Sequence, residues 1–283
     1  MPMPSTGTNV RFNKVPQVTV DFWVIKLLAV TVGETAADYM NLDLDLGLST
    51  TSWILTAVLV VALAVQFAQN RYIPWVYWTA VVLISVVGTL VTDNLVDNFG
   101  VSLITTTIVF TILLAITFAV WYAVERTLSI HTIVTIRREA FYWLAILFTF
   151  ALGTSAGDLA AEQFGLGYLA TGLIFAGIIA VIAASYYLGK LGAITAFWLA
   201  YILTRPVGAS LGDFFSQTPD HGGLGLGTIV TSYVFLGGIA LVVLYMSLTH
   251  EGVEKMEVSQ DNQRSDTPAL PAPESEPIGG GDR

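Results

Sequence analysis

The chain alternates between long apolar runs and short polar segments. There are eight apolar runs of about 20 residues, the length that an α-helix needs to cross the hydrocarbon core of a bilayer. The pattern predicts helices at approximately 20–40, 50–68, 73–94, 103–123, 141–160, 168–188, 194–214 and 227–248. We therefore expect an all-α fold, a polytopic transmembrane helical bundle of about eight helices.

The composition agrees with a membrane protein and excludes an ordinary soluble domain. Of the 283 residues, 54% are hydrophobic and only 12% are charged, whereas soluble domains carry about 25% charged residues. So few charged residues cannot cover the surface of a soluble protein of this size. The lipid bilayer is the first partner that the sequence predicts.

A three-point pattern recurs four times inside the apolar sequence. In each copy a Trp precedes a Gly by ten residues, and the Gly precedes an Asp by five. The copies begin 55, 65 and 55 residues apart, so the pattern indicates an internal repeat. The members are Trp23, Trp78, Trp143 and Trp198; Gly33, Gly88, Gly153 and Gly208; and Asp38, Asp93, Asp158 and Asp213.

Each repeat holds two apolar runs, so the four two-helix repeats must share one orientation. They are therefore parallel repeats, related by rotation about the membrane normal. We expect five segments: 1–17 as an N-terminal segment, 18–121 as repeats 1 and 2, 122–139 as a linker, 140–248 as repeats 3 and 4, and 249–283 as a disordered acidic tail.

The residues around the repeated Gly and Asp resemble those of a known family. The segments Thr31–Asp38, Val87–Asp93, Leu152–Asp158 and Arg205–Asp213 resemble a prokaryotic family of uncharacterised integral membrane proteins with four tandem two-helix repeats of unknown function. The resemblance covers approximately residues 13–248 and implies the architecture, without implying an activity.

Basic residues predict the orientation of the chain. Ten Lys and Arg residues lie in the termini or between repeats, and the loops inside repeats contain none. Positive charge marks the cytoplasmic side, so we expect a multi-pass protein of the cell inner (plasma) membrane with both termini in the cytoplasm.

Seven ionisable side chains fall inside the predicted helices near the repeated motif. Five are acids, Glu34 and the four repeat Asp residues, and two are bases, Lys26 and Arg205. A charge facing lipid costs about 2.5–3.5 kcal/mol or more, so these groups either line a protein interior or, for the Asp residues, cap helices at the outer interface. If they share one interior, the excess of acids must be neutralised by protons or bound cations.

The residue types favour a hard cation as ligand. The predicted helices contain no His and the chain no Cys, whereas carboxylate and hydroxyl oxygens suit protons, sodium, magnesium, calcium or manganese. The repeated Gly residues could pack helices closely or expose backbone to an ion. The predicted ion-binding residues are Glu34, Asp38, Asp93, Asp158, Asp213, Thr35, Thr89, Thr154, Ser155 and Ser210, with Lys26 and Arg205 as charge partners.

A transporter or channel for a small hard cation is the function that this pattern favours. Two alternatives stay open: a membrane scaffold that binds a protein partner, and an intramembrane enzyme using paired carboxylates. We predict no cofactor apart from a bound hard cation, no ATP-binding motif and no nucleic-acid partner, and we leave a monomer or an oligomer open. Asp97 and Glu162 fall in outer loops and are interpreted as solvated.

Overall fold

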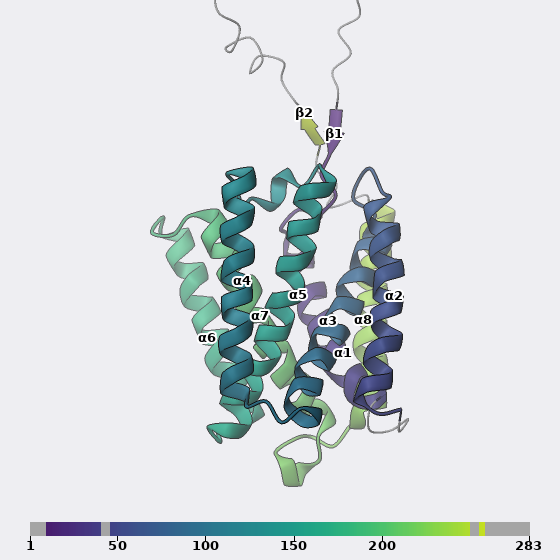
Figure 1. Ribbon diagram of the computed structural model, residues 1–283, viewed down its shortest axis with the longest axis vertical. Helices are drawn as coiled ribbons and strands as arrows, with labels where there is room; N and C mark the ends of the chain where they lie inside the picture. Colours follow the sequence, from purple (N-terminus) through teal and green to yellow (C-terminus); the bar gives the residue numbers. More distant parts are fainter. Residues whose placement is uncertain (1–9, 41–45, 250–254, 258–283) are drawn as a thin grey trace, which may run out of the picture.

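The computed structural model describes residues 10–40, 46–249 and 255–257. This part of the chain contains eight long α-helices that stand side by side (Figure 1), which confirms the predicted fold class. In chain order they are α1 (Val20–Asp38), α2 (Leu48–Phe67), α3 (Pro74–Asp93), α4 (Leu103–Glu125), α5 (Ile136–Asp158), α6 (Tyr168–Tyr187), α7 (Ala193–Ser216) and α8 (Gly227–Thr249).

Seven of the eight described helices are long and apolar enough to cross a membrane. The exception is α1, which carries Asp21, Lys26, Glu34 and Asp38 within 19 residues. It lies against α3, α7 and α8, and Lys26 and Glu34 are buried. The two charges in the middle of α1 thus face protein, which is the condition under which ionisable groups persist at membrane depth.

The helices form two concentric layers. The first helices of the repeats close into an inner ring, in which α1 contacts α3, α3 contacts α5, α5 contacts α7 and α7 contacts α1. The apolar stretches of α3, α5 and α7 are 56–72% buried, whereas those of α2, α4, α6 and α8 are only 6–22% buried. The second helices therefore form the outer layer, which presents its apolar surface to lipid.

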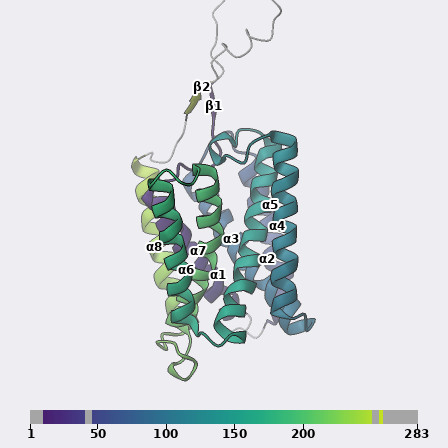
Figure 2. The same ribbon diagram turned by 90° about the vertical axis from the view of Figure 1, so that its left-hand side faces the viewer.

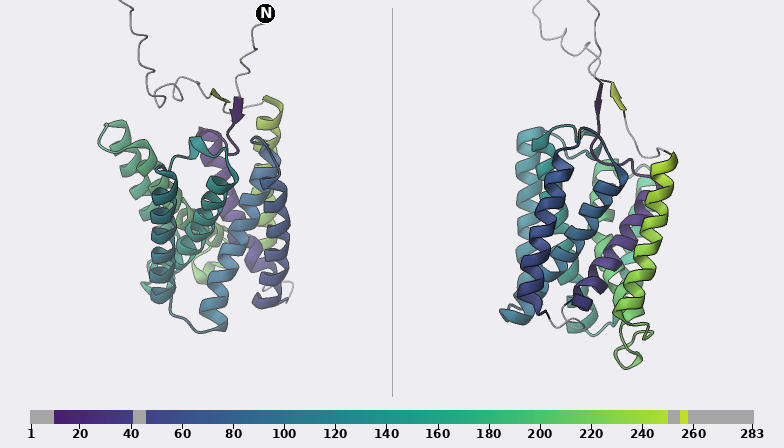
Figure 3. Two further views of the ribbon diagram at one scale, coloured as in Figure 1. Left: turned by 45° about the horizontal axis from the view of Figure 1, so that its top comes forward. Right: turned by 90° about the vertical axis from the view of Figure 1, so that its right-hand side faces the viewer.

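Each outer helix packs on the inner helix of the following repeat. The pairs are α2 with α3, α4 with α5, α6 with α7, and α8 with α1. Figure 2 shows α6 beside α7, and the right-hand view of Figure 3 shows α8 beside α1. Because the last outer helix returns to the first inner helix, the four repeats close into a cycle.

The repeat glycines are the contact points between neighbouring inner helices. Each faces the residue three positions before the glycine of the next repeat: Gly33 faces Ser85, Gly88 faces Phe150, Gly153 faces Arg205, and Gly208 faces Val30. A methyl group placed on Gly88 would lie 2.8 Å from Cβ of Phe150 and 3.3 Å from the backbone nitrogen of Ala151. Of the two roles considered for these glycines, close helix packing is the one that the structure bears out.

Substituting Gly88 by Ala should therefore destabilise the protein by about 1–3 kcal/mol, because backbone and Cβ atoms cannot rotate away from the added methyl group. Gly177, in the middle of α6, has no atom within 4 Å of such a methyl group. Gly177→Ala is thus a matched control that should melt no lower than wild type. Thermal unfolding in detergent measures both, and equal melting temperatures for the two variants would contradict the packing role.

A layer of aromatic rings closes the ring of inner helices toward the end at which residues 10–12 lie (Figure 1). The ring preceding each repeat Trp contacts the Trp of the next repeat, with centroids 5.4–6.2 Å apart. Trp78, Trp143 and Trp198 are buried, so these residues pack neighbouring repeats together. The four contacts join Phe22 to Trp78, Tyr77 to Trp143, Tyr142 to Trp198, and Phe197 to Trp23.

Between the aromatic layer and the end of the bundle at which residues 10–12 lie, the segment before α1 packs into the interior. Nζ of Lys14 donates to Oε2 of Glu139 at 2.7 Å and to the carbonyl of Phe67 at 3.0 Å. Nε2 of Gln66 donates to the other Glu139 oxygen at 3.0 Å. Glu139 was expected in the linker, but α5 begins at Ile136, where the Thr135 hydroxyl accepts from the amide of Arg138.

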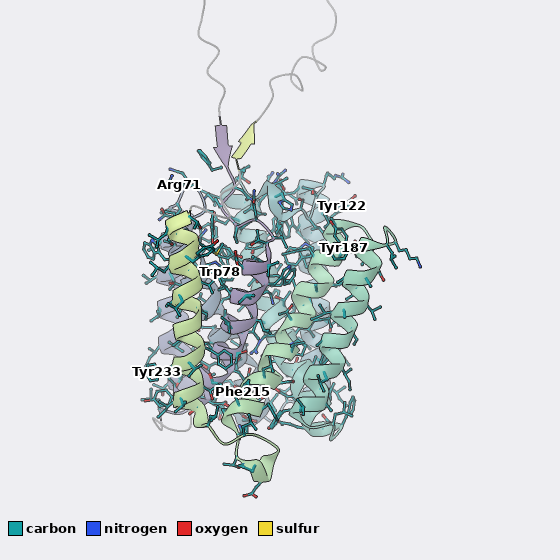
Figure 4. All side chains as sticks on the ribbon, turned by 180° about the vertical axis from the view of Figure 1, so that it is seen from behind. Arg71, Trp78, Tyr122, Tyr187, Phe215 and Tyr233 are labelled. Carbon is teal, nitrogen blue, oxygen red and sulfur yellow. The ribbon has the colours of Figure 1, made fainter. Side chains whose placement is uncertain are left out.

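Two three-residue strands lie beside this end of the bundle. Strand β1 (Val10–Phe12) pairs antiparallel with β2 (Lys255–Glu257), so a short part of the predicted disordered tail is ordered. The remainder of that tail, 250–254 and 258–283, lies outside the described residues. Figure 4 places Arg71, Tyr122 and Tyr187 toward the same end as the strands, and Phe215 and Tyr233 toward the opposite end.

Candidate functional site: an acidic cavity above a buried ion pair

The four repeat Asp residues converge. All four, together with Glu34, line one cavity of about 200 Å³ at the end of the bundle opposite the strands. Each repeat contributes an acid from the end of its inner helix, so the cavity lies where the four inner helices meet. Helix capping at four separate points of the rim, the other interpretation of the sequence, does not describe this arrangement.

Two further acids that the sequence analysis assigned to solvent also line the cavity. They are Asp97 and Glu162, which bring the number of lining acids among the described residues to seven. In the second and third repeats the helix continues past the Asp as a π-helical turn, Asn94–Asn98 and Leu159–Gln163. The missed signal is the spacing, because Asp97 and Glu162 each follow a repeat Asp by four residues and share its helical face.

The fourth repeat carries the same spacing with a neutral side chain. Gln217 follows Asp213 by four residues and lines the cavity, as does Tyr168 at the start of α6. A second tier of polar groups thus surrounds the mouth of the cavity, outside the tier formed by the repeat Asp residues.

All ionisable groups in the described lining of the cavity, apart from Tyr168, are carboxylates. Glu34 and Asp213 are buried, Asp38, Asp93 and Asp158 are half-buried, and Asp97 and Glu162 are exposed. No Lys, Arg or His belongs to the described lining. Two like charges 4–8 Å apart near a protein surface repel each other by roughly 2–4 kcal/mol. Seven ionised carboxylates are therefore unfavourable here unless protons or cations neutralise part of the charge.

On the side of the cavity that faces the middle of the bundle, Arg205 contacts the other three repeats. Its Nη2 donates to Oε2 of Glu34 at 2.8 Å and to the Thr154 hydroxyl at 2.7 Å. The hydroxyl of Thr89 is also within hydrogen-bond distance of this nitrogen, which has two hydrogens to share among the three oxygens. Glu34, Thr89 and Thr154 each follow the repeat glycine directly, so they present equivalent oxygens from three repeats to a cation supplied by the fourth.

Lys26 takes a different environment from Arg205. Its ammonium donates to the carbonyl of Tyr201 at 2.9 Å and lies 4.0 Å from the centroid of the Tyr201 ring. Among the ion pairs of the described residues, Arg205 pairs with Glu34, and Lys26 pairs with no carboxylate. The predicted role of charge partner thus fits Arg205, while Lys26 is held by a carbonyl dipole and an aromatic face.

The predicted hydroxyl ligands divide between the two layers. Thr89 and Thr154 face the ring interior, but the next position in each repeat faces away from it. Thr35 lies 2.7 Å from the hydroxyl of Ser232 on α8, and Ser210 packs beside Gly172 on α6. Ser155 donates to the carbonyl of Leu152 in its own helix. Thr35, Ser155 and Ser210 are therefore removed from the predicted ion-binding set, because a step of one residue turns a side chain about 100° around the helix.

The acids surround a shared space without forming a tight chelate. Among the described residues, no three His, Asp or Glu side chains are grouped closely enough to hold one metal ion directly. The cavity is instead suited to protons, or to a cation that keeps part of its water and is attracted by the summed charge.

Four parallel two-helix repeats, closed into a ring around buried charges, define the class: a polytopic membrane protein built from tandem repeats. The chain belongs to the DUF347 family, described as Repeat of Unknown Function, which matches residues 22–72, 76–127, 141–190 and 196–251. Each match covers most of one inner helix and the whole outer helix that follows it, which confirms the resemblance found in the sequence. No curated protein and no solved structure matches the chain.

Proposed function

We propose that this protein is a transporter or channel for a small hard cation, with a proton or a sodium ion as the favoured species. The observation that carries the proposal is the convergence of seven acids from all four repeats on one cavity without a basic side chain in its described lining. Such a cavity raises the local concentration of cations, because its low-dielectric walls focus the field of the carboxylates.

The choice between the hard cations rests on the spacing of the acids. Magnesium, calcium and manganese are usually bound by several direct oxygen ligands in a defined geometry. The described acids provide no group of three that could bind one ion in this way. Protons and sodium ions make weaker geometric demands, so we favour them over divalent cations.

We propose that the cavity faces the outside of the cell inner (plasma) membrane and that both termini are cytoplasmic. The support is the positive-inside distribution of the Lys and Arg residues. Arg71, which lies between the first two repeats, is at the end of the bundle that carries the strands, whereas the cavity is at the opposite end. A cation would accordingly enter the cavity from the outside.

Substituting one repeat Asp by Asn should lower cation flux by about tenfold, because removal of one carboxylate weakens the attraction for a cation by more than 1 kcal/mol at an effective dielectric constant of 20. The measurement is uptake of labelled sodium, and of protons with a pH-sensitive dye, into proteoliposomes containing the purified variants. The variants are Asp38→Asn, Asp93→Asn, Asp158→Asn and Asp213→Asn.

Asp220→Asn is the matched control, because Asp220 is exposed and does not belong to the described lining of the cavity. Its flux should equal that of wild type. Unaltered flux in all four cavity variants, at equal protein incorporation, would contradict the proposed function. Normal cellular abundance and phenotype of the same four variants would then favour the scaffold alternative.

A further inference from the structure

One nitrogen of Arg205 occupies the point where equivalent oxygens of three repeats meet. Nη2 is within hydrogen-bond distance of the Glu34 carboxylate and of the hydroxyls of Thr89 and Thr154. A carboxylate and two hydroxyls are oxygen donors of the kind that hard cations prefer. The guanidinium nitrogen therefore lies in a three-oxygen cage that also suits a metal cation.

The remainder of the guanidinium is poorly satisfied. Arg205 is only 1% exposed, yet neither Nε nor Nη1 has a hydrogen-bond partner among the described residues. The Ser85 hydroxyl, at the equivalent position of the second repeat, is also buried and has no hydrogen-bond partner in the described part of the chain. A buried donor without an acceptor is unfavourable. Arg205 is thus held in the cage through one nitrogen, and its unpaired Nε and Nη1 hydrogens would gain acceptors by moving.

The backbone beside Arg205 is weakened as well. Pro206 lies inside α7 and has no amide hydrogen, so the carbonyl of Ile202 lacks its usual helical partner. Helices kink at such positions, and Arg205 immediately precedes this one. A change of direction at Pro206 would move the guanidinium relative to the three oxygens, which come from α1, α3 and α5.

We propose that Glu34, Thr89 and Thr154 form a cation-binding site in which the Arg205 guanidinium is a tethered competitor. A sodium ion that arrives from the cavity takes the place of Nη2 beside Glu34, and the Arg205 guanidinium moves from the cage to the acids that line the cavity, whose negative charge then compensates it. Without the ion, the guanidinium fills the cage. This inference rests on the proposed function, because the ion reaches the cage through the acidic cavity.

The order of the groups along the ring supports this sequence of events. Glu34 belongs to both places, since it lines the cavity and pairs with Arg205. On the other side of Arg205, the ring of Phe150 lies 5.8 Å from the guanidinium carbon, and this ring is part of the buried core. The Glu34 carboxylate is thus the last acid that a cation meets before the closed part of the ring.

The experiment is a titration of the purified protein with sodium chloride, in which isothermal titration calorimetry measures the sodium affinity. The buffer cation is N-methylglucamine. Arg205→Gln removes the competitor and should tighten sodium binding at least tenfold. Arg205→Lys keeps a positive charge with fewer hydrogen bonds and should tighten binding by a smaller factor. Arg137→Gln, the same substitution at an exposed residue, should leave the affinity unchanged.

The location of the site is tested in the background of the first variant. Thr154→Val and Glu34→Gln, each combined with Arg205→Gln, should return sodium binding to wild-type strength or weaker. If Arg205→Gln does not fold, as judged by size exclusion and thermal melting, the Arg205→Lys titration alone decides. Unchanged sodium affinity in every Arg205 variant that folds, or equally tight binding in the Glu34→Gln combination, would overturn the inference.

The outcomes separate this inference from the proposed function. Flux that depends on the repeat Asp residues, together with sodium binding that is indifferent to Arg205, would retain the transporter and reject the tethered competitor. Absence of flux in wild type and in the cavity variants would reject the function itself.

Discussion

Glu34→Gln should destabilise the protein by about 3–5 kcal/mol, because it leaves a buried guanidinium without a counter-charge. Arg205 is 1% exposed, and Glu34 is its only carboxylate partner among the ion pairs of the described residues. The hydroxyls of Thr89 and Thr154 could still accept hydrogen bonds, but they carry no charge. Thermal unfolding in detergent should show the loss as a large fall in melting temperature.

A double-mutant cycle identifies the cause of this loss. Glu34→Gln combined with Arg205→Gln removes both charges, so it should recover most of the stability that the single Glu34 substitution loses. Glu162→Gln is the matched control, because it neutralises an exposed acid of the same cavity and should not lower the melting temperature. A Glu34→Gln protein that melts like wild type would show that the buried pair does not stabilise the ring.

Lys14→Met should cost a similar amount, about 3–5 kcal/mol, at the other end of the bundle. Glu139 is fully buried, and Lys14 is its charge partner at 2.7 Å. Without Lys14, the carboxylate keeps the amide of Gln66 as its partner among the described residues. Because Lys14 also donates to the carbonyl of Phe67, the substitution loosens the segment before α1 from the end of α2.

An ion pair with an exposed base supplies the comparison. Arg137 lies 2.5 Å from Glu125, but the Arg137 side chain is 67% exposed, and Glu125 keeps a second partner in Arg138 at 2.7 Å. Such pairs contribute about 0–1 kcal/mol, so Arg137→Met should melt close to wild type. Equal melting temperatures of the Lys14→Met and Arg137→Met proteins would contradict the role assigned to burial.

Most of the helical architecture follows from local information. An apolar run of about 20 residues favours a helix wherever its side chains lie, and every described helix except α5 begins and ends within a few residues of the prediction. The start of α5 was missed because Arg137, Arg138 and Glu139 are charged, and charge within an apolar pattern suggests a loop. Burial of Glu139 against Lys14, 125 residues earlier in the chain, reverses that expectation.

The sequence predicted which types of residue form the candidate site, but it did not predict every residue that lines the cavity. The spacing of Gly33 to Asp38 and its three copies identified the acids, because an exact repeat imposes the same environment on each member. Asp97 and Glu162 were assigned to solvent, since a turn was expected directly after the repeat Asp. The π-helical continuation of α3 and α5 carries them instead into the lining of the cavity.

Hydropathy and periodicity in the sequence thus determine the number of helices, their grouping into parallel repeats and the excess of intramembrane acids, because these depend on neighbouring residues and on covalent order. Which helices form the inner ring, how each outer helix joins the next repeat, and which oxygen meets Arg205 depend on contacts between distant segments. Such contacts are selected by the fit of one surface to another, as between Gly88 and Phe150, and that fit exists only once the four repeats have closed into a ring.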